Sequence, residues 1–140
     1  MSSEESASTT LLVVDDEPQL LRLMTRVLER GSFRVLSAAD ANEAMAILEA
    51  HHDEIRLVVL DVILPPRGID ELLDRLVTRH DGVPVVLTSG DTIDDAIRTQ
   101  VEARGGVFLR KPFSPKLLLK IVQDLLAAVR GAASGVAEGA

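Results

Sequence analysis

The stretch Arg56-Leu57-Val58-Val59-Leu60-Asp61-Val62-Ile63-Leu64-Pro65 decides the fold that the sequence predicts. Its apolar run, Leu57 to Leu60, is too short for a helix and does not alternate with polar residues, which is typical of a strand buried on both faces of a parallel sheet. Asp61 stands at the end of this strand, where open parallel sheets present their reactive groups. An aspartate there is more commonly a turn former or a helix cap, so Asp61 alone indicates little.

The whole chain repeats this pattern five times. Continuous apolar runs at 11–14, 57–60, 85–87 and 107–109, with a further strand candidate at 33–38, alternate with amphipathic helical patterns at about 18–30, 40–50, 69–80, 92–104 and 115–130. The alternation predicts one α/β domain of the flavodoxin-like (βα)5 class, a five-stranded parallel sheet with helices on both faces. We expect a disordered arm at 1–10, the domain at 11–130 and a flexible tail at 131–140.

Several residues are predicted to begin or end these helices. Pro18 suits a first helical position, and Gly31 is expected at C′ after the same helix. Asp40 with Glu43 three residues later forms a capping-box pattern, and Ser114 before Pro115 is a further N-cap.

Composition excludes several classes of function. The net charge of −7 argues against a nucleic-acid surface, and the three phenylalanines are the only aromatic rings. No apolar run approaches the ~20 residues that cross a bilayer, and the N-terminus lacks a signal-peptide pattern. With no cysteine for disulfides or thiolate metal sites, we expect a cytoplasmic protein. The adjacent His51 and His52 are interpreted as cations at a helix end rather than as metal ligands.

Chemistry-bearing residues follow four of the five predicted strands. Because parallel strands end at one edge of the sheet, that edge collects Asp15, Asp16, Asp61, Thr88, Ser89 and Lys111. Three carboxylates there would repel one another unless a cation lay among them, and oxygen ligands favour Mg²⁺ or Mn²⁺ over zinc. A lysine and a hydroxyl could then stabilise a phosphoryl group, with a carboxylate as its acceptor.

These motifs resemble the receiver domain of two-component response regulators, either stand-alone or part of a hybrid sensor histidine kinase. The resemblance covers roughly 11–130 and rests on four segments: Val13-Val14-Asp15-Asp16-Glu17-Pro18, Leu60-Asp61 with Pro65, Val86-Leu87-Thr88-Ser89-Gly90 and Leu109-Arg110-Lys111-Pro112-Phe113.

The resemblance implies a role for each matching position. Asp61 would accept a phosphoryl group from a phosphohistidine of a sensor histidine kinase or histidine phosphotransfer protein. Asp16 and Asp61 would bind Mg²⁺ directly, Asp15 largely through water, and the backbone carbonyl of Ile63 would be another ligand. The chain would catalyse only its own phosphorylation and dephosphorylation, and would not be a turnover enzyme.

The resemblance also implies a switch. Lys111 would pair with a phosphoryl oxygen, and its bond to Pro112 would be cis. Thr88 would turn toward the phosphoryl group while Phe108 swings inward. One departure is that Gly68 falls one residue early for the family's pattern after the phosphoacceptor, so the loop before the third helix is expected to be unusual.

The last predicted helix carries more apolar surface than one core face requires. Its apolar side chains span roughly 200°, against the ~100° of an ordinary amphipathic stripe. Either a partner or homodimer surface or a deeply set helix would account for this width. The residues concerned are Leu117, Leu118, Leu119, Ile121, Val122, Leu125, Leu126 and Val129. An unidentified downstream protein is the expected partner.

Three other functions fit the sequence less well. A degenerate receiver that acts only as an interaction module is disfavoured by the complete acidic, hydroxyl and lysine set. A Mg²⁺-dependent phosphohydrolase would need a second aspartate two residues after the first, and Asp61 is followed by Val62-Ile63. A dinucleotide-binding enzyme would need a glycine-rich turn after Val14, which is absent.

Overall fold

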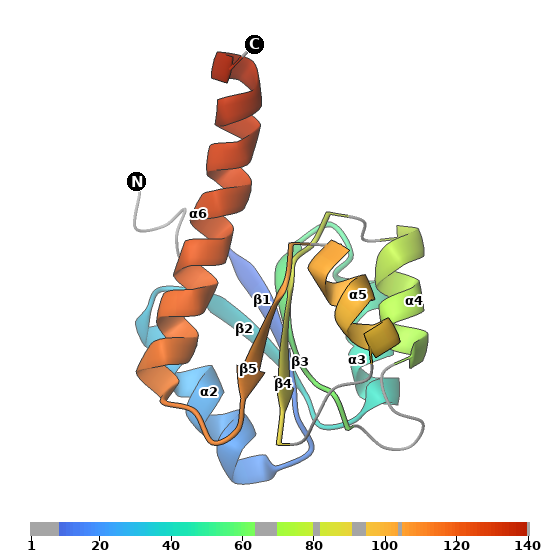
Figure 1. The fold of residues 1–140 in the computed structure, drawn as a ribbon. Helices are drawn as coiled ribbons and strands as arrows, with labels where there is room; N and C mark the ends of the chain where they lie inside the picture. Colours follow the sequence, from blue (N-terminus) through green and yellow to red (C-terminus); the bar gives the residue numbers. More distant parts are fainter. Residues whose placement is uncertain (1–8, 64–69, 80–81, 91–94, 104, 140) are drawn as a thin grey trace.

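The computed structural model describes residues 9–63, 70–79, 82–90, 95–103 and 105–139. Five strands and five helices alternate along the chain (Figure 1). In order they are β1 (Thr10–Val14), α2 (Pro18–Arg30), β2 (Arg34–Ala38), α3 (Ala41–Ala50), β3 (Ile55–Asp61), α4 (Asp70–Arg79), β4 (Val85–Ser89), α5 (Asp95–Ala103), β5 (Val107–Arg110) and α6 (Pro115–Gly139). None of the helices in these ranges has the length and apolar content that a bilayer span requires.

The strands form one parallel sheet in the order β2-β1-β3-β4-β5. Helices α2 and α6 cover one face of the sheet, and α3, α4 and α5 cover the other (Figure 1). This arrangement confirms the predicted flavodoxin-like α/β fold.

Two apolar layers explain why the central strands are continuous apolar runs. Alternate residues of a strand point to opposite faces, and here both faces are covered by helices. Leu12, Val58 and Leu60 therefore pack toward α3, α4 and α5, while Leu11 and Val59 pack toward α2 and α6. Every residue of β1 and β4 is buried. The two helical layers hold the sheet between them, and all the strands end at the same edge of the sheet.

The end of α2 differs from the prediction by one residue. Gly31 has φ −81°, and the left-handed residue is Ser32, with φ 74°. Ser32 N–H donates to the Glu29 carbonyl at 2.9 Å and Phe33 N–H donates to that of Leu28 at 3.2 Å, which is a Schellman motif with Ser32 at C′. Placing Gly31 at C′ was therefore wrong. Leu119 of α6 packs closely over position 31, where a Cβ would lie 2.6 Å from Leu119 Cδ1.

The other predicted caps are present. Asp40 accepts a hydrogen bond from Glu43 N–H at 2.8 Å, and Glu43 in return accepts from Ala39 N–H at 2.7 Å. Ser114 Oγ accepts from Lys116 N–H at 3.2 Å, at the start of α6. Asp40 and Ser114 each satisfy a donor that the first helical turn leaves unpaired, whereas Glu43 bonds the residue before the N-cap.

The last helix is longer than the sequence predicted. We expected it to end near Arg130, but α6 continues to Gly139 and extends beyond the sheet (Figure 1). The added segment contains alanines, which favour a helix. Its glycines lower helix propensity, but it has no proline to interrupt the backbone hydrogen bonds. The predicted helix end was wrong. The flexibility of 131–140 stays a prediction. The predicted arm at 1–10 was too long by at least one residue, because Thr10 is buried as the first residue of β1. Residues 1–8 of the arm and the loop around Gly68 lie outside the described residues.

Most of the wide apolar surface of α6 faces the core. Leu118 and Val122 are buried, whereas Leu117 is 45% exposed. The remaining apolar residues with described side chains are half-buried against the α2–α6 layer: Leu119, Ile121, Leu125 and Leu126. The deeply set helix therefore accounts for most of the width that the sequence left open.

Candidate functional site

The strand ends bring the predicted site residues to one edge of the sheet. Asp15 and Asp16 follow β1, Asp61 ends β3 and Lys111 follows β5. One carboxylate oxygen from each of the three aspartates lies within 4.8 Å of the others. The acidic cluster is therefore assembled from residues that are far apart in sequence.

Backbone contacts hold the strand ends in register. Asp61 is the register partner of Thr88 on β4. Asp15 N–H donates to the carbonyl of Ala38 at 3.1 Å, and Lys111 N–H donates to that of Ser89 at 2.7 Å. The Lys111–Pro112 peptide bond is cis.

Asp15 is the most deeply buried member of the cluster. Its Oδ1 accepts a hydrogen bond from Glu17 N–H at 2.8 Å. Its Oδ2 is also buried and has no well-directed hydrogen bond in the described part of the chain, although the Lys111 ammonium lies 3.0 Å away as an ion-pair partner. Burial raises the pKa of Asp15, and the hydrogen bond from Glu17 N–H and the nearby Lys111 charge only partly oppose this effect.

Asp61 presents a carboxylate fixed at both oxygens. Its Oδ1 accepts from Ile63 N–H at 3.1 Å and its Oδ2 accepts from Lys111 Nζ at 3.1 Å. The residue is 6% exposed, whereas Asp16 is exposed. Asp61 is therefore oriented toward the cleft with little freedom to rotate.

Lys111 lies among three carboxylates. Its Nζ is 2.8 Å from Glu17 Oε1, 3.0 Å from Asp15 Oδ2 and 3.1 Å from Asp61 Oδ2. Burial alone would favour the neutral amine, but the bonds to Glu17, Asp15 and Asp61 outweigh it and raise the pKa of Lys111. The ammonium form is thus strongly favoured. Glu17 was not predicted as a site residue, and its only signal was its place directly after Asp15-Asp16 in the sequence.

These side chains border an open cleft of about 250 Å³. Asp15, Asp16, Asp61 and Glu17 bring four carboxylates to this edge of the sheet, against the single ammonium group of Lys111, so the cluster retains excess negative charge. The donor set is all oxygen, the chemistry that Mg²⁺ prefers. The Asp15, Asp16 and Asp61 carboxylates therefore fit a small divalent cation. The lining residues are Asp16, Glu17, Asp61, Ile63, Gly90 and Lys111.

The two predicted switch residues lie on neighbouring strands. Thr88 is fully buried, and its Oγ1 has no hydrogen-bond partner among the described residues. Phe108 pairs in register with Leu87 and is half-buried, with the Arg98 guanidinium 4.6 Å from its ring centroid. A buried hydroxyl without a partner is costly, which suits a group that acquires one in another state.

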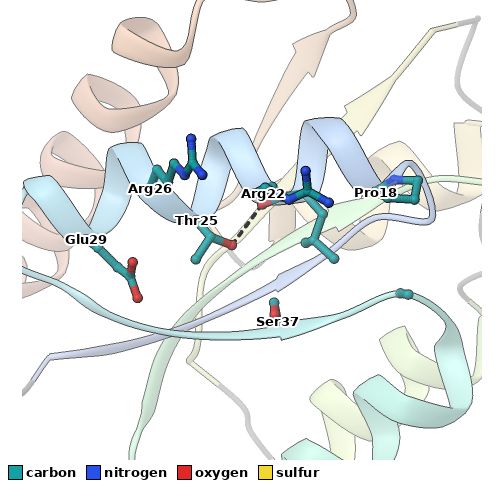
Figure 2. Close-up of a pocket in the computed structure, with 8 residues that line it drawn as sticks. Pro18, Arg22, Thr25, Arg26, Glu29 and Ser37 are labelled. Atoms are coloured by element: carbon teal, nitrogen blue, oxygen red, sulfur yellow. Dashed lines mark hydrogen bonds between the residues drawn. The ribbon is translucent and has the colours of Figure 1, made fainter.

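A second groove lies apart from the acidic cleft. Figure 2 shows it between α2 and β2, with Arg22, Arg26 and Glu29 on the helix and Ser37 on the strand. Its volume is about 470 Å³, and it contains none of the predicted site residues. Thr25 Oγ1 donates to the Leu21 carbonyl at 2.8 Å beside it.

Each residue of the histidine pair lies beside an acidic neighbour. His51 Nδ1 lies 2.9 Å from Glu54 Oε2, and His52 Nε2 lies 3.0 Å from Asp53 Oδ1. In the described part of the chain, the one group of three or more potential metal ligands is the aspartate cluster.

Comparison with known proteins shows which family this chain resembles. A family model described as the response regulator receiver domain matches residues 11–123. The probable transcriptional regulatory protein TcrX of Mycobacterium tuberculosis is 33% identical over 127 residues, covering 90% of this chain and 53% of that protein. The sensor kinase CckA of Brucella abortus is 33% identical over 126 residues, covering 89% of this chain and 13% of that protein.

A solved structure shares the fold. The Vibrio cholerae chemotaxis protein CheY4 superposes with a TM-score of 0.71 at 25% identity, over 84% of this chain and 98% of that one. This chain spans about half, or less, of the length of the curated relatives it matches. The family match over 11–123 includes the three aspartates at the strand ends that form the acidic cluster. The chain belongs to the family of response regulator receiver domains.

Proposed function

We propose that this chain is a phosphorylatable switch of a two-component or phosphorelay system. Asp61 accepts a phosphoryl group from a phosphohistidine in a Mg²⁺-dependent reaction. The observation that carries the proposal is the Asp61 carboxylate in an open cleft, with two further aspartates within 4.8 Å and Lys111 at 3.1 Å. That arrangement combines a nucleophile with the charges that phosphoryl transfer requires.

The transfer forms one bond and breaks one bond. An Asp61 carboxylate oxygen bonds to phosphorus while the phosphorus–nitrogen bond to the donor imidazole breaks, and the imidazole nitrogen leaves with the electron pair. Ile63 N–H and Lys111 orient the two oxygens of Asp61 before transfer. The carboxylates of Asp15, Asp16 and Asp61, with the Ile63 carbonyl, would hold Mg²⁺. When bound, Mg²⁺ neutralises charge on the phosphoryl oxygens.

After transfer, the chain's own residues stabilise the product. Lys111 pairs with a phosphoryl oxygen, since its ammonium already lies 3.1 Å from Asp61. Thr88 supplies the hydroxyl donor that the unmodified state leaves without a partner. Phe108, whose ring now lies 4.6 Å from the Arg98 guanidinium, then moves inward.

The output is a changed partner-binding surface over α5, β5 and α6. The proposed partners are a sensor histidine kinase or histidine phosphotransfer protein and a downstream protein. The exposed Leu117 on α6 supports a further contact there, including a homodimer through α6. The protein acts in the cytoplasm and catalyses only its own phosphorylation and dephosphorylation.

Amide hydrogen exchange tests the switch. The protein would be treated with acetyl phosphate and Mg²⁺, and exchange over 95–128 compared with untreated protein and with Asp61→Asn treated identically. We expect altered exchange in β5 and the first turns of α6 only where Asp61 is present. Unchanged exchange in a phosphorylated sample would instead favour an interaction module that works without phosphorylation.

A further inference from the structure

The ion pair between Glu17 and Lys111 separates two clefts. Both residues line the acidic cleft, and both also line a neighbouring cleft of about 520 Å³. The neighbouring cleft is largely apolar, with Leu20, Leu23 and Phe113 among its lining residues. The Glu17 Oε1–Lys111 Nζ contact of 2.8 Å is therefore part of the wall between them.

Three carboxylates surround the Lys111 ammonium. Its Nζ donates hydrogen bonds to Glu17 Oε1 at 2.8 Å and to Asp61 Oδ2 at 3.1 Å, and Asp15 Oδ2 lies 3.0 Å away as an ion-pair partner. An ammonium group carries three N–H donors, and a phosphoryl oxygen that approaches Lys111 competes with these carboxylates for them. The partner that is released follows from how firmly each is held.

Two of the three partners are anchored and one is not. Asp15 and Asp61 are buried, and each accepts a backbone N–H bond on its other oxygen. The Glu17 side chain is 59% exposed and begins at the N-cap of α2, from which it reaches across to Lys111. Releasing Glu17 to solvent thus disturbs the fewest other contacts.

We propose that Glu17 is a positioning residue that restrains Lys111 in the unphosphorylated protein and swings away when the phosphoryl group arrives. This inference rests on the proposed function. The Glu17–Lys111 ion pair then acts as a gate: when the Glu17 carboxylate leaves Lys111 Nζ, one Lys111 donor is freed and the two clefts join. This movement also removes a negative charge from the path of an anionic phosphodonor.

Glu17→Gln is the decisive variant, because glutamine keeps the side-chain length and loses the charge. We expect its rate of phosphorylation on Asp61 by acetyl phosphate at saturating Mg²⁺ to exceed the wild-type rate about threefold to tenfold. Glu29→Gln is the matched control. It removes the same charge from an exposed position on the same helix, outside the acidic cleft, and should phosphorylate at the wild-type rate.

Ionic strength separates displacement of a bonded partner from a diffuse charge effect. At about 1 M salt, interactions between exposed charges are screened beyond about 3 Å. If Glu17→Gln is still phosphorylated faster than wild type at this salt concentration, the result supports release of a Lys111 donor. If the two rates become equal, the gate is wrong.

A second readout needs neither Mg²⁺ nor phosphorylation. The Lys111 side-chain NMR signal, assigned with Lys111→Arg, should shift in Mg²⁺-free Glu17→Gln and stay in place in Glu29→Gln. An unshifted signal would show that the ion pair is not formed in solution and would overturn the inference.

The kinetic outcomes keep the two proposals apart. If wild-type protein forms the Asp61 adduct and Glu17→Gln forms it at the same or a lower rate, the gate is wrong and the switch stands. If wild-type protein forms no adduct, the proposed function fails and the gate fails with it.

Discussion

Replacing Thr88 with valine is predicted to stabilise the protein while disabling its switch. Thr88 is fully buried, and its Oγ1 has no partner among the described residues. Burying an uncompensated hydroxyl costs about 1–3 kcal/mol relative to its hydrated unfolded state. Valine has nearly the same volume and removes that cost. We therefore expect Thr88→Val to raise the free energy of unfolding by about 1–2 kcal/mol and the Tm by about 3–6 °C.

The assay is urea and thermal unfolding followed by far-UV circular dichroism, since the chain has neither Trp nor Tyr as a fluorescent probe. Thr25→Val is the matched control. Thr25 is half-buried on α2, and its Oγ1 already donates to the Leu21 carbonyl at 2.8 Å. Removing a satisfied hydroxyl should bring no gain in stability.

The same variant tests the function of the hydroxyl. Thr88→Val should still form the Asp61 adduct, because Asp61, Lys111 and the other aspartates are untouched. Its amide exchange over β5 and α6 should no longer respond to phosphorylation. The reasoning is refuted if Thr88→Val is no more stable than wild type, or if its exchange responds as the wild-type protein does.

Gly106→Ala, with Gly90→Ala as its control, tests packing, and Asp15→Asn tests charge. Gly106→Ala should lower the free energy of unfolding by about 2–3 kcal/mol, because a Cβ there would lie 2.3 Å from the Val85 carbonyl oxygen. Gly90→Ala, whose Cβ meets no atom within 4 Å in the described part of the chain, should change urea unfolding by at most about 0.5 kcal/mol. Asp15→Asn should raise stability at pH 7 without Mg²⁺ by about 1 kcal/mol. Burial raises the pKa of Asp15, so the folded wild-type protein binds the Asp15 proton more tightly than the unfolded chain does. The stability of the wild-type protein therefore falls as pH rises from 3.8 through the raised pKa of Asp15. The advantage of the variant should shrink as pH is lowered toward 4, and a variant less stable than wild type at pH 7 would contradict this account.

The sequence predicted the site residues that lie at the ends of the strands. Continuous apolar runs mark where β1, β3 and β4 finish, so the residues that follow them had to meet at one edge. That reasoning placed Asp15, Asp61 and Thr88 together, as the structure shows. It required only the period of the apolar pattern and the parallel topology.

The features that the sequence did not predict depend on side-chain reach or on small backbone choices. Glu17 contacts a lysine 94 residues away, and nothing local specifies that contact. The left-handed residue after α2 is Ser32, whereas Gly31 lies under Leu119 of α6, and the local sequence does not distinguish these two positions. The tail beyond Arg130 has weak signals of both kinds, alanine favouring helix and glycine opposing it, so its helical state was missed.

The most direct test of the central claim is the intact mass of the protein after treatment with acetyl phosphate. Parallel samples would contain Mg²⁺, a chelator, or the Asp61→Asn variant with Mg²⁺, with Asp53→Asn as a matched exposed-aspartate control. The account predicts one phosphoryl adduct with Mg²⁺, none with chelator, none in Asp61→Asn and an unchanged adduct in Asp53→Asn. A folded wild-type protein that forms no adduct, or an adduct that persists in Asp61→Asn, would contradict it.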